Sequence, residues 1–208
     1  MRRALVFGGL AADGWRITEA LMADGISVDV VSSALSDDER EMEEEREFYF
    51  GRNSLFHRLA EANDCQPTDM VYFVDTLRLK SELRHCMEAK MLPIFENAGQ
   101  IHAPFYFLLS STDVYGRQTA DLHLPVKPDT TIGRSANQME LFFIANVKKI
   151  RAVRALIFRA DGSPQAGRYA ALLAKATFQG LEVVHYFSDQ PETAAVHEKL
   201  LRFVRPSH

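Results

Sequence analysis

The sequence has 208 residues, of which 47% are hydrophobic, 10% aromatic and 25% charged, a balance that excludes a disordered, collagen-like or coiled-coil chain. No apolar run approaches the roughly 18–20 residues of a membrane-spanning helix, and the net charge of −4 argues against a general nucleic-acid-binding protein. The two cysteines, Cys65 and Cys86, predict neither a disulfide framework nor a zinc motif, so we expect no metal site and a cytoplasmic location.

The N-terminal third of the chain predicts a β-α-β unit. Ala4–Phe7 is a continuous apolar strand that ends at two glycines, Trp15–Asp24 has helical spacing, and Ile26–Val31 is a second apolar strand. Arg2 and Arg3 ahead of an apolar run are also compatible with a signal peptide. The uninterrupted continuation into a helix and a strand favours the buried strand instead.

The acidic charge is concentrated directly after this unit. Asp37–Glu47 holds eight acids and two arginines out of totals of 28 and 24, which leaves 20 acids and 22 bases elsewhere. We expect this segment to be an exposed helix. Its position beside the end of the second strand makes NADP a less favourable cofactor than NAD, because a 2′-phosphate would meet acidic charge.

The remaining pattern alternates strands with helices. Strands are predicted at Glu47–Phe50, Met70–Val74, Phe105–Leu109, Ala155–Phe158 and Leu181–Phe187. Helices are predicted around Leu55–Ala62, over 79–98 with a kink or restart at Pro93, at Ser135–Asn146 and Tyr169–Ala176, and from Pro191 onwards. The fold class is therefore α/β, a doubly wound, Rossmann-like parallel sheet of about seven strands. We expect a single domain over 1–208, in which 161–208 completes the sheet.

The glycine loop after the first strand is the first candidate ligand site. Gly8 and Gly14 occupy the outer positions of a G-x-x-G-x-x-G register, and Ala11 occupies the middle position. A methyl group there narrows the approach of a phosphate, and Asp13 at the start of the helix would repel one. The loop is either a retuned phosphate cradle or a plain turn without a ligand. Its candidate cofactor contacts are Gly8, Gly9, Leu10, Ala11 and Gly14.

Candidate cofactor contacts also lie at the ends of later strands. The second strand ends at Ser32 and Ser33 rather than at the acidic residue that usually holds the ribose hydroxyls. Val74 and Ser110 lie at the ends of two further strands. NAD is the candidate cofactor, and a protein without any cofactor is the alternative.

Leu108–Gly116 reads LLSSTDVYG, which resembles the S-S-x-x-V-Y-G stretch of the extended short-chain dehydrogenase/reductase superfamily, the NAD-dependent epimerase/dehydratase group. The order of glycine loop, strand Asp69–Val74, this stretch and a strand ending at Arg159 is similar to that family from residue 4 to about 160. The resemblance implies a Rossmann-like fold, NAD, and catalysis by a Ser or Thr, a Tyr, and a Lys four residues after the Tyr.

The implied catalytic set is incomplete. Ser111 falls at the Ser/Thr position, but Ile132 replaces the Tyr and Ala136 replaces the Lys, while Gly133 and Ser135 are retained. A tyrosine with a pKa of about 10 needs a nearby cation to act as a base, so this dyad cannot relay a proton here. Candidate substitutes are Tyr115, Arg134, His123 and Lys127, although each also has a structural interpretation, and Ser111 could simply cap a strand end.

The resemblance also implies a carboxyl-terminal substrate lobe, for which residues 161–208 leave little length. We therefore expect a pocket that is small, shared with a partner subunit or absent. A homodimer across the helix over 79–98 is what the resemblance implies. No histidine pair has the spacing of a metal site.

Three functions remain open from the sequence. The first is a diverged member of this superfamily that binds a small molecule, with or without a dinucleotide. It would catalyse a non-redox isomerase, cyclase or lyase step, or a reduction that needs no tyrosine. The second is a non-catalytic binding or assembly protein with this fold. The third, a conventional NAD-dependent sugar-nucleotide epimerase or dehydratase, is disfavoured by Ile132 and Ala136.

Overall fold

The computed structural model describes residues 2–101, 103–116, 126–162 and 180–186. These residues form one seven-stranded sheet in the order β3-β2-β1-β4-β5-β6-β7, and all neighbouring strands are parallel. The strands are β1 (Arg3–Phe7), β2 (Ser27–Val31), β3 (Phe56–Arg58), β4 (Met70–Phe73), β5 (Phe105–Ser111), β6 (Arg154–Ala160) and β7 (Gly180–Tyr186). The doubly wound, Rossmann-like sheet of seven strands is confirmed.

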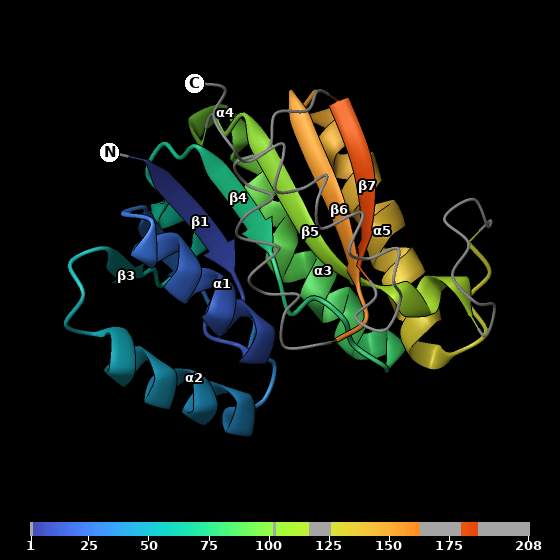
Figure 1. Ribbon diagram of the computed structural model, residues 1–208, viewed down its shortest axis with the longest axis horizontal. Helices are drawn as coiled ribbons and strands as arrows, with labels where there is room; N and C mark the ends of the chain where they lie inside the picture. Colours follow the sequence, from blue (N-terminus) through green and yellow to red (C-terminus); the bar gives the residue numbers. More distant parts are fainter. Residues whose placement is uncertain (1, 102, 117–125, 163–179, 187–208) are drawn as a thin grey trace.

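Helices cover both faces of the sheet (Figure 1). They are α1 (Ala12–Ala23), α2 (Asp37–Phe50), α3 (Ser81–Glu96), α4 (Ala98–Ile101) and α5 (Thr131–Lys149), with short 3-10 helices η1 (Ala62–Asp64) and η2 (Thr112–Tyr115). Ile17 and Leu21 of α1 pack on one face, and Met91 of α3 and Phe143 of α5 pack on the other. The strands read as continuous apolar runs because side chains on both faces are buried.

The third strand was predicted in the wrong place. Glu47–Phe50 is the last turn of α2, and the strand is Phe56–Arg58, inside the segment predicted to be a helix over Leu55–Ala62. Ser36 caps α2 by accepting a hydrogen bond from the Glu39 amide at 3.2 Å, and this helix continues until Phe50 reaches the core. Pairing of Phe56 with Val28 of β2 then overrides the local helical spacing.

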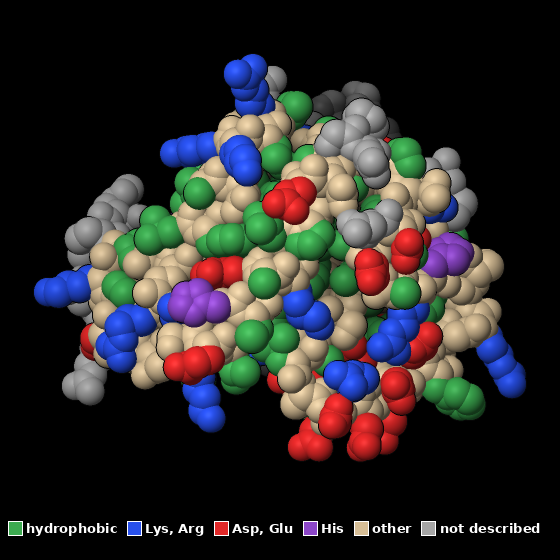
Figure 2. Space-filling model, turned by 180° about the vertical axis from the view of Figure 1, so that it is seen from behind, with side chains coloured by type: hydrophobic (Ala, Val, Ile, Leu, Met, Phe, Trp, Pro, Cys, Tyr) green, Lys and Arg blue, Asp and Glu red, His purple; other side chains and the backbone are tan. Residues whose placement is uncertain are grey.

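The end of α2 is fixed by aromatic packing. The ring of Phe50 lies 4.4 Å from that of Trp15 and 5.4 Å from that of Phe56, measured between centroids. Most acids of α2 are exposed, and Figure 2 shows acidic side chains gathered at the lower edge of the molecule, the end at which α2 lies in Figure 1. Glu39 and Glu47 are half-buried, and Glu43 is buried, with only 2% of the residue exposed.

Other boundaries differ less from the prediction. The helix α3 runs through Pro93 to Glu96, and α4 restarts at Ala98. The helix α5 begins at Thr131, four residues earlier than predicted, because the Thr130 hydroxyl accepts a hydrogen bond from the Gly133 amide at 2.9 Å. The helices predicted at Tyr169–Ala176 and from Pro191, as well as Phe187 and His123, lie outside the described residues.

No helix within the described ranges is long and apolar enough to cross a membrane. The homodimer implied for the α3 surface stays a prediction.

Gly14 fixes the distance between α1 and the end of β1. A Cβ atom at Gly14 would lie 1.9 Å from the backbone oxygen of Gly8 and 2.9 Å from the Cα of Gly9. We expect Gly14→Ala to lower the free energy of unfolding by about 3 kcal/mol, because backbone atoms cannot move aside as a flexible side chain would. Urea denaturation measures this change.

Gly51→Ala is the matched control, because the nearest atom to its added Cβ is 3.4 Å away and its φ is −61°. We expect a change within about 0.5 kcal/mol for this variant. A Gly14→Ala protein as stable as wild type would contradict the close packing of α1 on β1.

Candidate functional site

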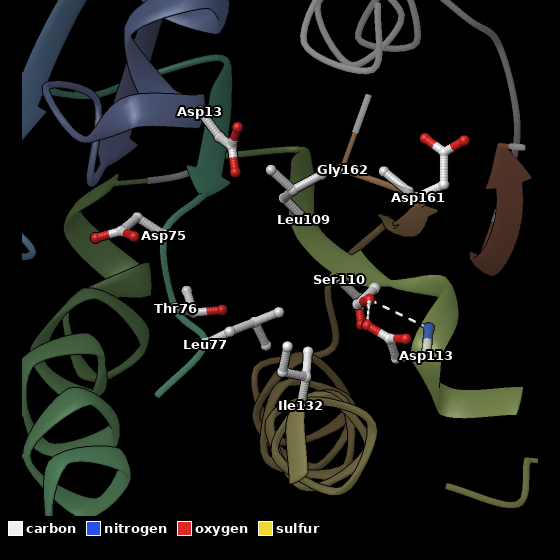
Figure 3. Close-up of a pocket in the computed structure, with 12 residues that line it drawn as sticks. Asp13, Asp75, Thr76, Leu77, Leu109, Ser110, Asp113, Ile132, Asp161 and Gly162 are labelled. Atoms are coloured by element: carbon white, nitrogen blue, oxygen red, sulfur yellow. Dashed lines mark hydrogen bonds between the residues drawn. The ribbon is translucent and has the colours of Figure 1, made fainter. Parts of the chain in front are cut away.

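A cavity of about 270 Å³ opens at the carboxyl ends of β4, β5 and β6, facing the start of α1. It therefore lies beside the point where the strand order reverses between β1 and β4, the usual ligand position in a doubly wound sheet. Figure 3 shows side chains from separate elements converging on it. Its lining residues are Asp13, Asp75, Thr76, Leu77, Leu109, Ser110, Ser111, Asp113, Ile132, Ala160, Asp161 and Gly162.

Ser111 and Asp113 form a hydrogen-bonded pair on one wall of this cavity. The Ser111 hydroxyl donates to Asp113 Oδ2 at 2.9 Å and accepts a hydrogen bond from the Asp113 amide at 3.1 Å (Figure 3). The second bond makes Ser111 the N-cap of η2. The serine thus has a structural role, and its hydroxyl also sits beside a carboxylate at the cavity wall.

The positions of the missing Tyr and Lys differ in their surroundings. Ile132 is 42% exposed in the first turn of α5 and lines the cavity, so a side chain at this position does face the site. Ala136 is fully buried and packs against Val114 and Tyr115. At the two positions where the resembled superfamily has its catalytic Tyr and Lys, the described residues therefore place apolar side chains.

The glycine loop is folded onto itself. The Ala11 amide donates to the Gly8 oxygen at 3.0 Å, and the Thr18 hydroxyl donates to the Gly9 oxygen at 2.9 Å. Gly8 has a φ of +76°, which suits glycine, and Gly14 packs against it as described above. The two outer glycines thus perform the turn and the helix packing, while the position that approaches a pyrophosphate is Ala11.

Charged side chains bind the backbone of the turn after β2, residues 32–35, which we call the β2 turn. The buried carboxylate of Glu43 accepts a hydrogen bond from the Ser33 amide at 3.2 Å, and Glu39 accepts one from the Leu35 amide at 2.6 Å. Both acids come from α2. The acidic segment is therefore more than an exposed helix, since two of its carboxylates satisfy the amides of this turn.

Basic side chains satisfy the neighbouring carbonyls. Lys90 of α3 donates to the Ala34 oxygen at 2.7 Å, and burial lowers the pKa of this lysine. Arg78 donates to the Ser33 oxygen at 3.3 Å. Arg46 of α2 donates to the Leu10 oxygen of the glycine loop at 2.6 Å. The backbone of the β2 turn is thus paired within the chain, as is the Leu10 carbonyl of the glycine loop, while the start of α1 has no side-chain cap.

Asp75 connects the β2 turn to the cavity. It accepts hydrogen bonds from the Ser33 hydroxyl at 2.7 Å and from Arg78 at 2.9 Å, and it adopts a left-handed φ of 54°. Burial, followed by the nearby charge of Asp75, raises the pKa of Asp13. Acidic side chains therefore stand at the first turn of α1, where an anionic pyrophosphate would bind.

The predicted cofactor contacts fall into separate places. Ser110 lines the main cavity, whereas Ser32 lines a second cavity of about 210 Å³ beside Lys90 and Glu61. The remaining predicted contacts line neither cavity, and they are Gly8, Gly9, Leu10, Ala11, Gly14, Ser33 and Val74. A dinucleotide in the usual position of a doubly wound sheet would lie beside the β2 turn and face Asp13. The described residues do not gather the predicted contacts around one cavity.

A buried polar cluster lies behind the cavity, between β5, β6, β7 and α5. Arg159 makes a bidentate pair with Glu140 at 2.6 and 2.9 Å, and Ser110 donates to the same carboxylate at 2.7 Å. Arg159 also donates to the Tyr115 hydroxyl, which bonds His185 Nδ1 at 2.6 Å. Tyr115, a predicted catalytic candidate, is therefore engaged in this cluster and does not line the cavity.

This cluster perturbs two titrating groups. Burial raises the pKa of Tyr115, although its bond from Arg159 acts in the opposite direction. Burial and the charge of Arg159 lower the pKa of His185 to about 4. Both groups are therefore neutral near neutral pH, which suits a structural hydrogen-bonded chain.

The sequence interpretation missed several residues of the site. Asp75, Thr76 and Asp161 follow β4 and β6, and their position at the carboxyl ends of buried strands was the available signal. Glu140 and His185 gave no local signal, because their partner Arg159 lies on another element. Arg134 and Lys127 do not line the cavity. Within the described ranges, no group of three or more potential ligands could hold a metal ion.

No protein-family model matches the chain, and no curated protein matches it. Solved structures do, including UDP-glucuronic acid 4-epimerase from Bacillus cereus in complex with NAD, with a TM-score of 0.64 and 16% identity. That match covers 76% of this chain, which spans 56% of the epimerase. UDP-N-acetylglucosamine 4-epimerase from Methanobrevibacter ruminantium, in complex with UDP-N-acetylmuramic acid, has a TM-score of 0.65 and 14% identity, covering 98% of this chain and 97% of the other.

A third match is dTDP-glucose 4,6-dehydratase from Bacillus anthracis in complex with NAD, with a TM-score of 0.58 and 11% identity over 77% of this chain and 55% of that one. At such identities the likeness concerns the fold. It agrees with the resemblance carried by LLSSTDVYG. The chain therefore has the fold of these two epimerases and of this dehydratase.

Proposed function

We propose that the protein binds a small molecule in the cavity at the carboxyl ends of β4, β5 and β6, and that it does so without a dinucleotide. The observation that carries this proposal is the contrast between two neighbouring places. The cavity is lined by the Ser111–Asp113 pair, whereas the β2 turn uses its polar backbone groups internally and Arg46 occupies the Leu10 carbonyl of the glycine loop.

The chemistry that this site supports is a non-redox step such as an isomerisation, elimination or cyclisation. The carboxylate of Asp113 can accept a proton from a bound ligand. The Ser111 hydroxyl donates a hydrogen bond to this carboxylate. Ile132 offers no proton, so a conventional epimerase or dehydratase mechanism is not proposed. A non-catalytic binding protein is the second candidate, and the capping role of Ser111 favours it.

Ligand binding in the cavity is tested by closing it. We expect compounds from a metabolite library to raise the melting temperature of the wild-type protein, and this rise to disappear in Ile132→Trp, because an indole at the rim fills the space. A compound present at about 100 times its dissociation constant should stabilise the protein by about 2.7 kcal/mol.

Val153→Trp is the control, since Val153 is 65% exposed and precedes β6, at the opposite end of the sheet. Compounds that stabilise the wild type and Ile132→Trp equally would show that they bind outside this cavity. Turnover of any of these compounds by the wild type would exclude the non-catalytic candidate. For such a compound, lost turnover in Ser111→Ala supports a catalytic role for Ser111, and an unchanged rate would make Ser111 structural.

Dinucleotide independence has its own test. We expect titration calorimetry to detect no binding of NAD, NADP or their reduced forms to the wild-type protein, because the β2 turn and Asp13 exclude them. The double variant Ala11→Gly, Asp13→Ile removes the added methyl and the charge of the loop. Gain of NAD binding by this variant would show that Ala11 and Asp13 of the loop are what prevent NAD from binding. Micromolar binding of NAD to the wild type would contradict the proposal.

We also propose that Tyr115 acts structurally through His185 rather than on a ligand. The lowered pKa of His185 keeps it neutral in the folded protein, while in the unfolded chain it is protonated below about pH 6.5. Stability is therefore lost as the pH falls from about 6.5 to about 4. We expect this loss to be about 2 kcal/mol smaller in His185→Gln, a value reduced for partial exposure of the ring.

Urea denaturation at several pH values measures this difference. Tyr115→Phe should lower stability at all these pH values, because Arg159 then loses a buried acceptor. Identical pH profiles for the wild type and His185→Gln would contradict the structural role.

A further inference from the structure

Carboxylates surround the cavity from four directions. Asp13 comes from the first turn of α1, Asp75 from the end of β4, Asp113 from η2, and Asp161 from the end of β6 (Figure 3). No lysine, arginine or histidine is among the described residues that line the cavity. The site is therefore formed by acids that are far apart in the sequence.

Two of these acids lie near a cation. Asp75 is directed away from the cavity in Figure 3 and pairs with Arg78 at 2.9 Å. Burial and the charge of Asp75 raise the pKa of Asp13, while the charge of Arg16 acts in the opposite direction. Asp113 accepts a hydrogen bond from the neutral hydroxyl of Ser111. A positive charge placed in the cavity would be attracted to the carboxylates of Asp13 and Asp113.

Thr76 gives an independent indication of a ligand. Its side chain is fully buried, and its hydroxyl has no hydrogen-bond partner among the described residues. The residue lines the cavity, and Figure 3 shows its oxygen directed toward the space between Leu77 and Ser110. A buried hydroxyl without a partner costs about 1–3 kcal/mol. A polar ligand group that bonds it would recover this free energy.

The remaining walls are apolar. Leu77, Leu109, Ile132 and Ala160 line the same space as the acids. Its volume of about 270 Å³ suits a small molecule rather than a dinucleotide. The ligand should then combine one polar, charged end with a compact apolar body.

We propose that this cavity selects a small organic cation, with a primary ammonium group that the carboxylates of Asp13 and Asp113 attract from opposite sides of the cavity and an apolar body against Leu77, Leu109 and Ile132. This inference rests on the proposed function, since it names the ligand class of the same cavity. An ammonium group also has protons to donate to the Thr76 oxygen. A metal ion is a poorer occupant, because no group of three potential ligands within the described ranges could hold one.

Three probes of one shape and different charge test the proposal. They are 2-phenylethylammonium, 2-phenylethanol and 3-phenylpropionate, titrated into the full chain with labelled Ile and Leu methyl groups. The methyl shifts of Leu77, Leu109 and Ile132 report binding in the cavity. We expect the ammonium probe to bind at least about tenfold more tightly than the alcohol, and the carboxylate to bind more weakly than both.

Matched variants assign this preference to the cavity. Asp13→Asn and Asp113→Asn should each weaken the ammonium probe by about threefold or more while leaving the alcohol unchanged. Glu45→Gln removes the same charge from an exposed position of α2 and should change neither. Weakening of the ammonium probe in Glu45→Gln by the same factor would overturn the proposal, because the preference would then reflect the overall charge of the protein.

The outcomes separate this inference from the function on which it rests. Equal affinity for the ammonium and the alcohol, or tightest binding of the carboxylate, would overturn the cation preference and leave the cavity as a ligand site. Absence of methyl shifts with all three probes would overturn the cation proposal. The function fails separately if the library compounds also stabilise Ile132→Trp as well as they stabilise the wild type.

Discussion

The structure depends on how the polar backbone at the ends of β1 and β2 is satisfied. A buried amide or carbonyl needs a hydrogen-bond partner, and a bound dinucleotide is one source of partners in a doubly wound sheet. Here Glu39 and Glu43 of α2 bond the amides of the β2 turn, and Lys90 bonds one of its carbonyls. Arg46 bonds the Leu10 carbonyl of the glycine loop. The β2 turn is therefore satisfied within the chain, whereas the start of α1 has no side-chain cap.

This pairing also shapes the cavity beside it. Asp75 bonds Ser33 of the β2 turn and pairs with Arg78, so its carboxylate is directed away from the cavity that its residue lines. Behind the cavity, the guanidinium group of Arg159 is paired with the carboxylate of Glu140. The described lining includes the acids Asp13, Asp113 and Asp161, the hydroxyl residues Thr76, Ser110 and Ser111, and several apolar side chains, and it holds no lysine, arginine or histidine. One distribution of charge thus accounts for both the disfavoured dinucleotide and the proposed ligand class.

The pattern of apolar residues predicted most of the fold. Strands buried on both faces appear in the sequence as uninterrupted apolar runs, and helices appear as apolar residues at helical spacing. The pattern was wrong for Glu47–Phe50, where an apolar helix end has the same letters as a short strand, and only tertiary pairing with β2 identifies Phe56–Arg58 as the strand. The glycine spacing located the loop but not its partner Arg46, which is 36 residues away. Ser111 could be found from its motif, whereas Thr76 and Asp75 became informative only once the ends of β4 and β5 were seen together.

Amide hydrogen exchange at Ser33 and Leu35, followed by NMR with and without NAD, tests most directly whether the chain itself satisfies the β2 turn. The account predicts slow exchange at both amides in the free protein and no change at saturating NAD, because Glu43 and Glu39 already accept these hydrogen bonds. Glu43→Gln should speed the exchange at Ser33. Fast exchange in the free protein that becomes slow only when NAD is added would contradict the account.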